Sequence, residues 1–258
     1  MPEGPEIRLA ADEVAMALVG KKAAAVDFAF LELRPYSQHL QGQRVVEVAT
    51  RGKAVLTHFE NGLVIYSHNQ LYGRWFVTRT GTFPETGRQL RLAIHNAHYS
   101  ASDIEVLTKE QLETHPVLAR LGPDLLSERP DAQAIRQRLQ LPRFRRRQLA
   151  GLLLDQVFVA GLGNYLHAEI LTRSGLHPAT KPADCSDRQL LELARQIIRL
   201  TRRSYDRRGI INPPALVRQL KQQGLVRRKQ YRSNTYGRDG ESCHFYGATI
   251  EISNLGGR

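Results

Sequence analysis

The sequence has little of what stabilises small secreted proteins or spans membranes. Its 258 residues include one tryptophan and two cysteines, and Cys185 and Cys243 cannot build a disulfide framework. No apolar run approaches the ~20 residues that cross a bilayer. The N-terminal segment MPEGPEIR has two acidic residues and lacks the apolar region of a secretory signal. We therefore expect a soluble cytoplasmic protein without a membrane partner.

Acidic residues are scarce in the second half of the chain. Residues 1–125 hold 13 Lys and Arg against 14 Asp and Glu, a net charge of −1. Residues 126–258 hold 24 against 11, a net charge of +13. Arg outnumbers Lys 30 to 7, which suits the forked recognition of phosphate. This asymmetry favours a polyanionic partner for the second half, with nucleic acid the first candidate.

Hydrophobic spacing in the first half predicts one helix followed by antiparallel strands. Residues 5–19 place apolar side chains at helical intervals, and Asn61-Gly62 predicts a type I′ hairpin. Strands are expected over residues 44–50, 53–60, 63–68, 74–80, 90–95 and 102–107. The predicted architecture is an antiparallel β-sandwich with an N-terminal helix.

The second half predicts helices and then a small hairpin. Helical periodicity covers residues 131–140, 145–155, 164–173 and 187–207. Ser186 and Gln189 predict a capping box for the last helix. The tail is basic, weakly strand-like and too small to own a core. The fold class is thus α+β and multidomain: a β-sandwich over 1–125, a helical domain over 126–217, and a C-terminal β-hairpin over 218–258.

The N-terminus is the first motif that could carry chemistry. Met followed by Pro commonly loses its initiator, which would leave Pro2 with a free secondary amine. An α-amine has a reference pKa near ~8, against ~10.4 for Lys, so more of it is unprotonated at neutral pH. Beside Glu3 and Glu6, such an amine suits Schiff-base chemistry at a sugar carbon. The alternative is a helix start with acids placed on its dipole.

Lys53 is the second candidate. It lies in Arg51-Gly52-Lys53, between two predicted strands. A lysine at a strand end could orient a phosphate or donate a proton near the N-terminal amine. The alternative is a solvated turn lysine.

A third motif covers residues 68–73, His-Asn-Gln-Leu-Tyr-Gly, a short loop that combines an amide, an aliphatic and an aromatic side chain in Gln70, Leu71 and Tyr72. Proteins that flip a base out of a duplex must fill the space that it leaves in the base stack and must hydrogen-bond the opposite base, which has lost its pairing partner. Leu and Tyr suit wedging, and Gln suits hydrogen bonding. The alternative is a turn whose apolar residues pack on the sheet.

The fourth motif is the turn Ala-Gly-Leu-Gly-Asn at residues 160–164. Two predicted helices flank it, which leaves backbone N–H groups and a helix N-terminus for a phosphodiester. Asn164 could donate to phosphate or cap the second helix. A dense basic run precedes the turn, namely Arg143, Arg145, Arg146 and Arg147.

Together these segments resemble the formamidopyrimidine-DNA glycosylase and endonuclease VIII superfamily. The resemblance rests on the order of MPEGPEIR, RGKAVLTHF, YSHNQLYGRW, YSASDIE, HPVLARLGPD, RFRRRQLAGLLLDQ and AGLGNYL, and covers about residues 1–205. It implies a helix–two-turns–helix motif around the fourth segment. PEGPE and SHNQLYG resemble the pyrimidine-directed endonuclease VIII branch more than the oxidised-purine branch.

The resemblance implies roles for individual residues. Pro2 would be the Schiff-base nucleophile at C1′ of the damaged nucleotide, and Glu3 the general acid–base. Lys53 would contact phosphate and assist proton transfer. Arg258 aligns with an Arg of the family's zinc finger that touches DNA. Gap filling and backbone phosphate binding would fall to a second group: Gln70, Leu71, Tyr72, Arg120 and Asn164.

The C-terminus departs from the family, which usually ends in a zinc finger with two C-x2-C pairs. Cys243 is present, but Tyr246 occupies the second ligand position, and the second pair is missing. Structural zinc needs four ligands, and Cys243 with His244 supplies at most two. We therefore predict no zinc and no other cofactor. The stretch between residues 90 and 100 is also short, which puts one sandwich edge in doubt.

These features predict a monomeric DNA glycosylase and abasic-site lyase acting on oxidised pyrimidines in damaged double-stranded DNA. The Schiff base would lead to β,δ-elimination of the strand. Two alternatives stay open: a lesion-binding paralogue with impaired catalysis, and an oxidised-purine glycosylase of the same superfamily. A third, an RNA- or ribosome-associated protein, has no matching signature.

Overall fold

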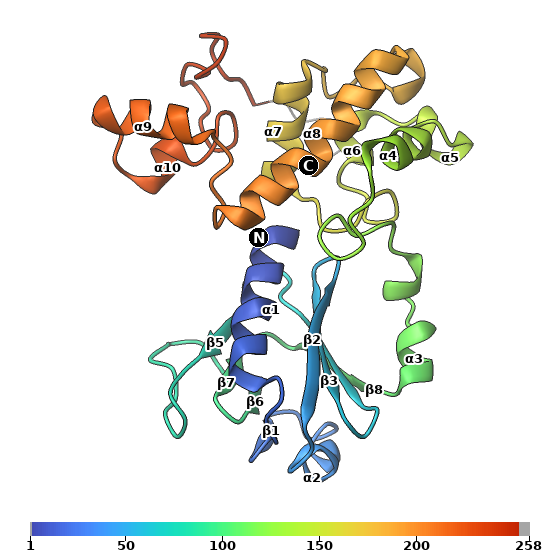
Figure 1. Cartoon of the computed structure of the whole chain (residues 1–258), viewed down its shortest axis with the longest axis vertical. Coiled ribbons are helices and arrows are strands. Elements are labelled where there is room, and N and C mark those ends of the chain that lie inside the picture. The colour runs from blue at the N-terminus through green and yellow to red at the C-terminus, as the bar shows by residue number, and fades with distance from the viewer. Residues whose placement is uncertain (1, 253–258) are drawn as a thin grey trace. The chain divides into compact units, whose positions relative to one another are not determined.

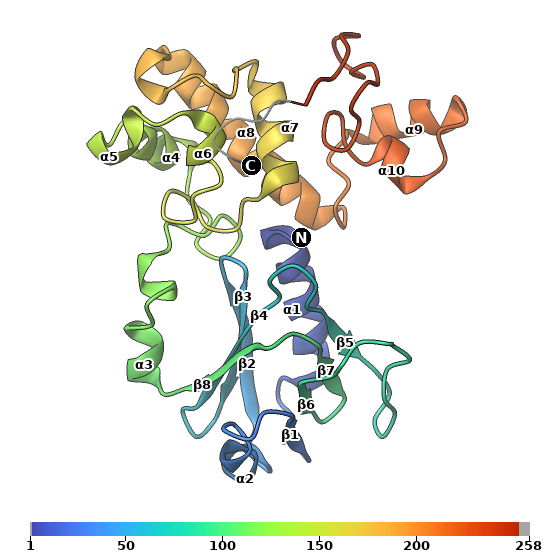
Figure 2. The same ribbon diagram turned by 180° about the vertical axis from the view of Figure 1, so that it is seen from behind.

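A computed structural model describes residues 2–252 (Figures 1 and 2). The chain divides into two compact units, with the division after Leu121. The expected boundary, after residue 125, is four residues C-terminal to this division. The tail expected as a third domain, residues 218–258, belongs to the second unit.

The first unit contains two four-stranded antiparallel sheets. Their strand orders are β1-β6-β7-β5 and β2-β3-β4-β8. The strands are β1 (Val26–Phe28), β2 (Val45–Arg51), β3 (Ala54–Phe59), β4 (Val64–His68), β5 (Trp75–Val77), β6 (Leu92–Ile94), β7 (Ala97–Tyr99) and β8 (Asp103–Leu107). The helices are α1 (Gly4–Leu18), α2 (Pro35–Leu40), α3 (Lys109–Glu113) and the 3-10 turn η1 (Leu118–Arg120). The predicted sandwich with an N-terminal helix is confirmed.

Helix α1 contributes one face to the core of this unit. Ile7, Ala11, Val14 and Leu18 recur at helical spacing and are buried. The helix contacts β2 and β3 of one sheet and β5 and β7 of the other. Burying this stripe against both sheets fixes the direction of the helix.

Helix α1 runs antiparallel to β2. Just past its C-terminal end, the Gly20 N–H donates to the carbonyl of Val45, the first residue of β2, over 2.9 Å. Fifteen helical residues span about 22 Å, and the seven residues of β2 about 20 Å. The start of α1 therefore lies at the end of the sheet where β2 turns into β3, as both ribbon views show.

The β3–β4 hairpin is confirmed, but its predicted type I′ turn is wrong. A type I′ turn needs positive φ at both central residues, and in Asn61-Gly62 only Gly62 has one, at +85°. The Phe59 N–H donates to the Leu63 carbonyl at 2.9 Å, and the Gly62 N–H to the Phe59 carbonyl at 3.0 Å. The connection is a three-residue loop ending in a left-handed glycine.

The stretch at residues 90–100 forms two very short strands in the middle of one sheet, whose edges are β1 and β5. Strands β6 and β7 pair antiparallel across Leu92 and Tyr99, and β1 extends the same sheet through Val26 and Ile94. Each has three residues, too few to show a period of two. The sequence pattern predicted β6 within residues 90–95 but did not predict β1 and β7.

The second unit is helical. Its helices are α4 (Ala132–Leu139), α5 (Pro142–Arg145), α6 (Leu149–Leu152), α7 (Asn164–Ser174), η2 (Pro182–Asp184), α8 (Asp187–Asp206), α9 (Pro214–Gln222) and α10 (Arg228–Tyr231). The capping box of Ser186 and Gln189 is confirmed. The continuous helix predicted over 145–155 is wrong. The N–H groups of Leu149 and Ala150 donate instead to the carbonyls of Thr180 and Pro178, which starts α6 afresh.

The C-terminal segment is more helical than its sequence suggested. The boundary expected after residue 217 falls inside α9. Beyond it, a hairpin is present with one isolated bridge between Ser242 and Thr249. The Cys243 N–H donates to the Ala248 carbonyl over 2.8 Å. Such a small element needs support from the helical core.

Glu169 of α7 supplies that support. Its carboxylate is fully buried and accepts the backbone N–H groups of Asn234 at 3.0 Å, Thr235 at 2.7 Å and Tyr236 at 3.0 Å. The Arg238 guanidinium then donates to the carbonyls of Asn234 at 2.6 Å and Ser242 at 2.8 Å. A buried carboxylate with three amide donors is a strong anchor.

Glu169→Gln should loosen this segment. A neutral amide accepts more weakly and brings two donors toward the three N–H groups, so we expect a loss of about 2–3 kcal/mol in local stability. Amide hydrogen exchange over residues 233–245 measures it. Glu192→Gln is the control, because Glu192 is a partly exposed carboxylate on α8. Unchanged exchange in Glu169→Gln would show that other contacts hold the segment.

Candidate active site

Pro2 and Glu3 directly precede helix α1 of the first unit. Glu3 is the N-cap of α1 and is 2% exposed, and its backbone N–H donates to the Glu6 carboxylate over 3.2 Å. Pro2 is half-buried beside it. The positive end of the helix dipole stabilises negative charge here. A carboxylate is thus held, shielded from water, next to the second residue of the chain.

Lys53 lies in the two-residue turn between β2 and β3. Arg51 pairs with Ala54, and Gly52 supplies φ of +62° at the first turn position. Lys53 is half-buried. Burial lowers the pKa of His68 on β4; Asp103 opposes this effect and the charge of Lys53 adds to it. The charge of Lys53 therefore reaches His68, the last residue of β4, after which the 69–73 loop begins.

The loop after β4 presents its side chains to solvent. Gln70 is exposed, Leu71 is 58% exposed and Tyr72 77%. The alternative in which Leu71 and Tyr72 pack on the sheet is therefore wrong. Both side chains are therefore accessible to a partner.

Backbone hydrogen bonds fix this loop. Gln70 has a left-handed φ of +47°, and its N–H donates to Nδ1 of His68 at 3.1 Å. The lowered pKa of His68 favours the neutral ring, which has one nitrogen able to accept such a hydrogen bond. The Gly73 N–H closes the loop on the Asn69 carbonyl at 2.7 Å, and the Arg88 guanidinium donates to the Tyr72 carbonyl. The sequence motif begins at His68, but no role for its imidazole was predicted.

A hollow of about 420 Å³ lies against the loop. Its other walls include Arg88, Arg91 and Ser100. The Asn69 side chain is 5% exposed, and its Oδ1 has no hydrogen-bond partner among residues 2–252. A Cβ at Gly73 would lie 2.4 Å from the Ala101 Cβ. The base of the loop, at Asn69 and Gly73, is thus tightly packed, whereas its tip, at Leu71 and Tyr72, is exposed to solvent.

Strand register brings these features to one end of the first unit. Ala54, next to Lys53, pairs with His68, and His68 pairs with Asp103. The turn after β2 and the loop after β4 therefore leave the sheet at the same end. The antiparallel course of α1 adds Pro2 to that end (Figure 2).

Arg120 is the exposed last residue of η1. Leu118 packs against Ala54 and Tyr66, and His115 stacks on the Tyr66 ring with centroids 4.9 Å apart. These contacts hold Arg120 against the sheet that carries Lys53.

In the second unit, the turn at residues 160–164 is buried except at its last residue. Gln156 organises it: its Oε1 accepts the Gly161 N–H at 2.9 Å, and its Nε2 donates to the Leu162 carbonyl at 2.9 Å. Gly163 is the N-cap, so Asn164 does not cap α7. The capping alternative is therefore wrong, and the exposed Asn164 begins the helix with its side chain toward solvent. The sequence did not reveal this role of Gln156, because its partners Gly161 and Leu162 are brought to it only when the chain turns back.

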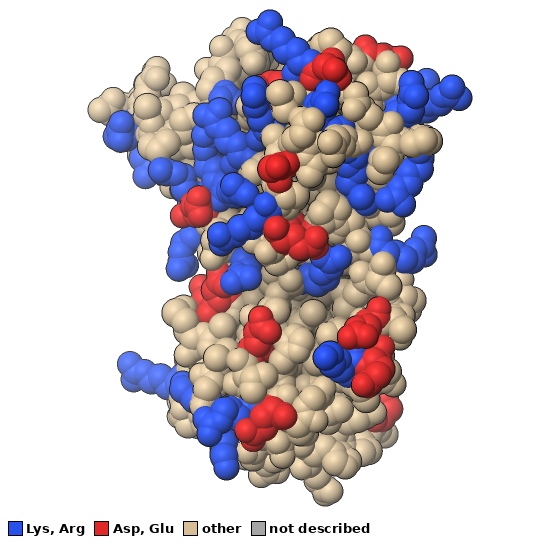
Figure 3. All heavy atoms as spheres, turned by 45° about the vertical axis from the view of Figure 1, so that its right-hand side comes forward, with Lys and Arg blue, Asp and Glu red and all other residues tan. Residues whose placement is uncertain are grey.

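Charge divides between the units as expected. In Figure 3, Lys and Arg crowd the surface of the second unit, whereas both signs mix over the first. All four arginines of the basic run are exposed: Arg143, Arg145, Arg146 and Arg147. Arg258 lies outside the described residues.

The C-terminal segment does not fit a zinc site. Within residues 2–252, no group of three or more His, Cys, Asp or Glu side chains could hold a metal. Burial would raise the pKa of the Cys243 thiol. Hydrogen bonds from Asn234 and from the amides of Phe245 and Tyr246, with the charge of Arg238, outweigh it and lower that pKa. Asn234 Nδ2 donates to this sulfur at 3.2 Å.

Two domain families match the chain. Residues 1–108 match the formamidopyrimidine-DNA glycosylase N-terminal domain, and residues 121–212 the H2TH domain of the same enzymes. The endonuclease 8 of Salmonella arizonae is 49% identical over 263 aligned positions, which span the whole chain and 96% of that relative. The chain belongs to the formamidopyrimidine-DNA glycosylase family. The endonuclease 8 of Salmonella heidelberg is 48% identical over the same span.

Solved structures share the fold. The Lactococcus lactis enzyme Fpg in complex with abasic-site DNA superposes with a TM-score of 0.79 at 20% identity, covering 99% of this chain and 96% of that one. A second complex of this enzyme, with THF-DNA and an inhibitor, gives 0.80 at 22% identity over 100% and 96%. Family membership confirms the predicted enzyme class, a DNA N-glycosylase and abasic-site lyase that binds DNA. Among residues 2–252, none of the helices combines the length and apolar character that a membrane crossing requires.

Gly73→Ala tests whether the exposed loop depends on its packed base. The added methyl would overlap Ala101 and the Asn69 backbone, so we expect a loss of about 1–3 kcal/mol in unfolding free energy. Binding to lesion-containing duplex should weaken with it, which fluorescence anisotropy measures. Gly87→Ala is the matched control, since its methyl would meet nothing within 4 Å. Equal behaviour of the two variants would refute the role given to the base of the loop.

Proposed function

We propose that this enzyme removes oxidised pyrimidines from damaged duplex DNA, with the Pro2 amine as nucleophile. One observation carries the proposal: Pro2, the buried Glu3, Lys53 and the exposed loop lie at one end of the first unit. The proposal requires removal of Met1. The 49% identity to an endonuclease 8 supports the pyrimidine branch.

The chemistry follows from the amine. Its nitrogen lone pair attacks C1′, the C1′–N bond to the base breaks, and the base leaves with a proton. Glu3 is the general acid–base for this step, because it is the shielded carboxylate beside Pro2. Opening of the sugar gives an iminium. Loss of a C2′ proton then expels the 3′-phosphate by β-elimination, and δ-elimination releases the 5′-phosphate.

The DNA contacts divide between the units. Leu71 and Tyr72 fill the space left by the everted base, and Gln70 hydrogen-bonds the widowed partner. Lys53, Arg120 and Asn164 bind backbone phosphates near the lesion. The family's finger arginine would correspond to Arg258. We propose that the enzyme acts as a monomer.

Parallel nicking assays on thymine-glycol and 8-oxoguanine duplexes test the substrate. We expect faster nicking of thymine glycol. Glu3→Gln should lower base release by about 10²- to 10⁴-fold and keep duplex affinity within about tenfold. Glu113→Gln on α3, exposed and remote from the proposed chemistry, is the control. Preference for 8-oxoguanine would favour the purine branch, and binding without nicking would favour a lesion-binding paralogue.

We also propose that activity needs no zinc. The Glu169 and Arg238 hydrogen bonds support the C-terminal segment in place of a metal. Dialysis against a strong chelator should therefore leave the melting temperature and the nicking rate unchanged. A structural zinc contributes on the order of 10–16 kcal/mol, so its removal would be obvious. Inactivation by the chelator with recovery on adding zinc would contradict this proposal.

A further inference from the structure

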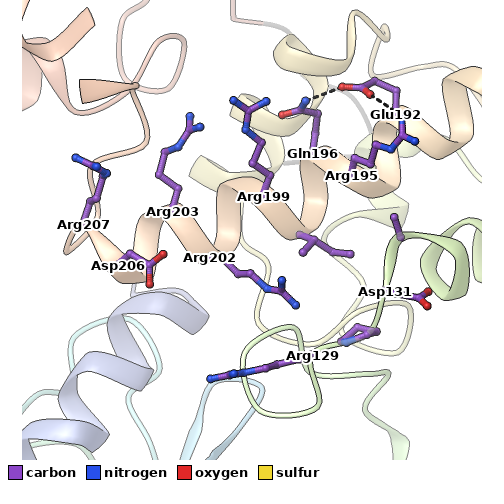
Figure 4. A pocket seen from close by; sticks show the side chains of 13 residues that line it. Arg129, Asp131, Glu192, Arg195, Gln196, Arg199, Arg202, Arg203, Asp206 and Arg207 are labelled. Atoms are coloured by element: carbon purple, nitrogen blue, oxygen red, sulfur yellow. Dashed lines mark hydrogen bonds and ion pairs between the residues drawn. The ribbon is translucent and has the colours of Figure 1, made fainter. Parts of the chain in front are cut away.

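The second unit carries a groove that the proposed chemistry does not use. It has a volume of about 780 Å³ and lies between residues 129–132, which lead into α4, and the outer face of α8 (Figure 4). Six arginines line it: Arg129, Arg195, Arg199, Arg202, Arg203 and Arg207. On a helical wheel, its α8 members lie opposite the buried stripe that includes Leu193, Ala194 and Ile197.

The groove is separate from the turn at residues 160–164. Helix α7, which begins at that turn, packs against α8. Their apolar side chains share one core, with Leu166 and Ile170 from α7. The groove arginines project from the other side of α8. An anion in the groove would therefore not be the strand that meets Asn164.

Four of the arginines are evenly spaced. Arg195, Arg199, Arg203 and Arg207 follow one another at four-residue intervals, about 6 Å apart along the helix axis. Figure 4 shows Arg199, Arg203 and Arg207 projecting from the same side of α8. This repeat is comparable to the separation of successive phosphates along an extended strand. The guanidinium fork also matches phosphate oxygens better than a lysine does.

The positive charge is only partly compensated. Three carboxylates line the groove, those of Asp131, Glu192 and Asp206, which leaves a net charge of +3 against the six arginines. Two of them are engaged: Asp131 accepts the Ala134 N–H at 2.7 Å, and Glu192 accepts from Gln196 Nε2 at 2.6 Å. Neither Arg199 nor Arg202 forms an ion pair within residues 2–252. Arg195 lies 3.8 Å from the Glu192 carboxylate and Arg203 donates to the Ile211 carbonyl at 3.1 Å, so the uncompensated charge is centred on Arg199 and Arg202.

Two further features point to a ligand. Gln196 is 5% exposed and lines the groove, and its Oε1 has no hydrogen-bond partner within the described residues. Arg129 holds a left-handed φ of +51°, an uncommon backbone conformation for a long side chain. Figure 4 shows Arg129 and Arg202 extending from opposite walls. A buried acceptor without a partner is costly, and a donor from an occupant of the groove would satisfy it.

We infer that the groove binds the phosphate backbone of a second nucleic-acid segment, in addition to the strand at the 160–164 turn. A strand lying along α8 would meet the four evenly spaced arginines in succession. The Gln196 Oε1 would accept a hydrogen bond from a base amino group, which a single strand presents on its open Watson–Crick edge and a duplex presents only inside its grooves. A single strand is therefore the preferred occupant. The regular, all-arginine lining favours nucleic acid over an acidic peptide.

A two-stage titration tests the inference. The protein is first saturated with a short duplex carrying a tetrahydrofuran abasic analogue, and a fluorescent single strand is then added. The test variant is Arg199→Ala/Arg202→Ala, and the control is Arg34→Ala/Arg79→Ala, which removes the same charge from exposed positions in the first unit. The same titration with an undamaged duplex probe and with a glutamate-rich peptide identifies the occupant.

We expect wild type and control to bind the second probe at low salt. The test variant should bind it about tenfold more weakly, with a log–log salt slope reduced by about 1.4, or 0.7 for each lost contact with a single strand. Its affinity for the first duplex should stay unchanged.

Absence of second binding, equal loss in the control, or equal weakening of the first duplex would overturn the inference. Tighter binding of the acidic peptide would assign the groove to a protein partner instead. Failure of the abasic duplex to bind would count against the proposed function. The second probe, titrated alone, would then still report on the groove.

Discussion

The antiparallel packing of α1 on β2 is the constraint on which the proposed chemistry depends. A chain terminus is ordinarily the least ordered part of a protein. Here a buried apolar stripe that includes Ile7 and Val14, and the hydrogen bond from Gly20 to Val45, fix both ends of the helix. Because helix and strand have similar lengths, the second residue of the chain arrives at the level of the β2–β3 turn. The packing of the helix thereby holds Pro2, the proposed nucleophile, at that end of the sheet.

The C-terminal segment of the second unit is basic and too small to have a core of its own, so contacts with the helices must hold it. The buried Glu169 carboxylate accepts three backbone N–H groups, and the Arg238 guanidinium donates to the carbonyls of Asn234 and Ser242. Charge-assisted hydrogen bonds of this kind are strong and directional. Cys243 belongs to the same network, because the Asn234 side chain donates to its sulfur.

The sequence predicted the elements whose signals are local, and it proposed site residues from contiguous motifs. The spacing of α1 and the capping box at Ser186 each lie within a few residues, and the four motifs that matched the family are contiguous. Contacts between distant residues were not predictable. Glu169 meets partners 65–67 residues away, and its letter alone does not distinguish it from a surface glutamate. The register that joins Lys53 to the 69–73 loop likewise required the paired strands.

The central claim, that the fold delivers the Pro2 amine to a deoxyribose carbon, is tested most directly by mass analysis of a borohydride-reduced adduct. The protein is incubated with abasic-site duplex and borohydride, digested, and the modified peptide is sequenced by fragmentation. The account predicts a single adduct on a peptide that begins at Pro2, with Met1 removed. An adduct on a lysine, or an adduct-free N-terminal peptide that retains Met1, would contradict it.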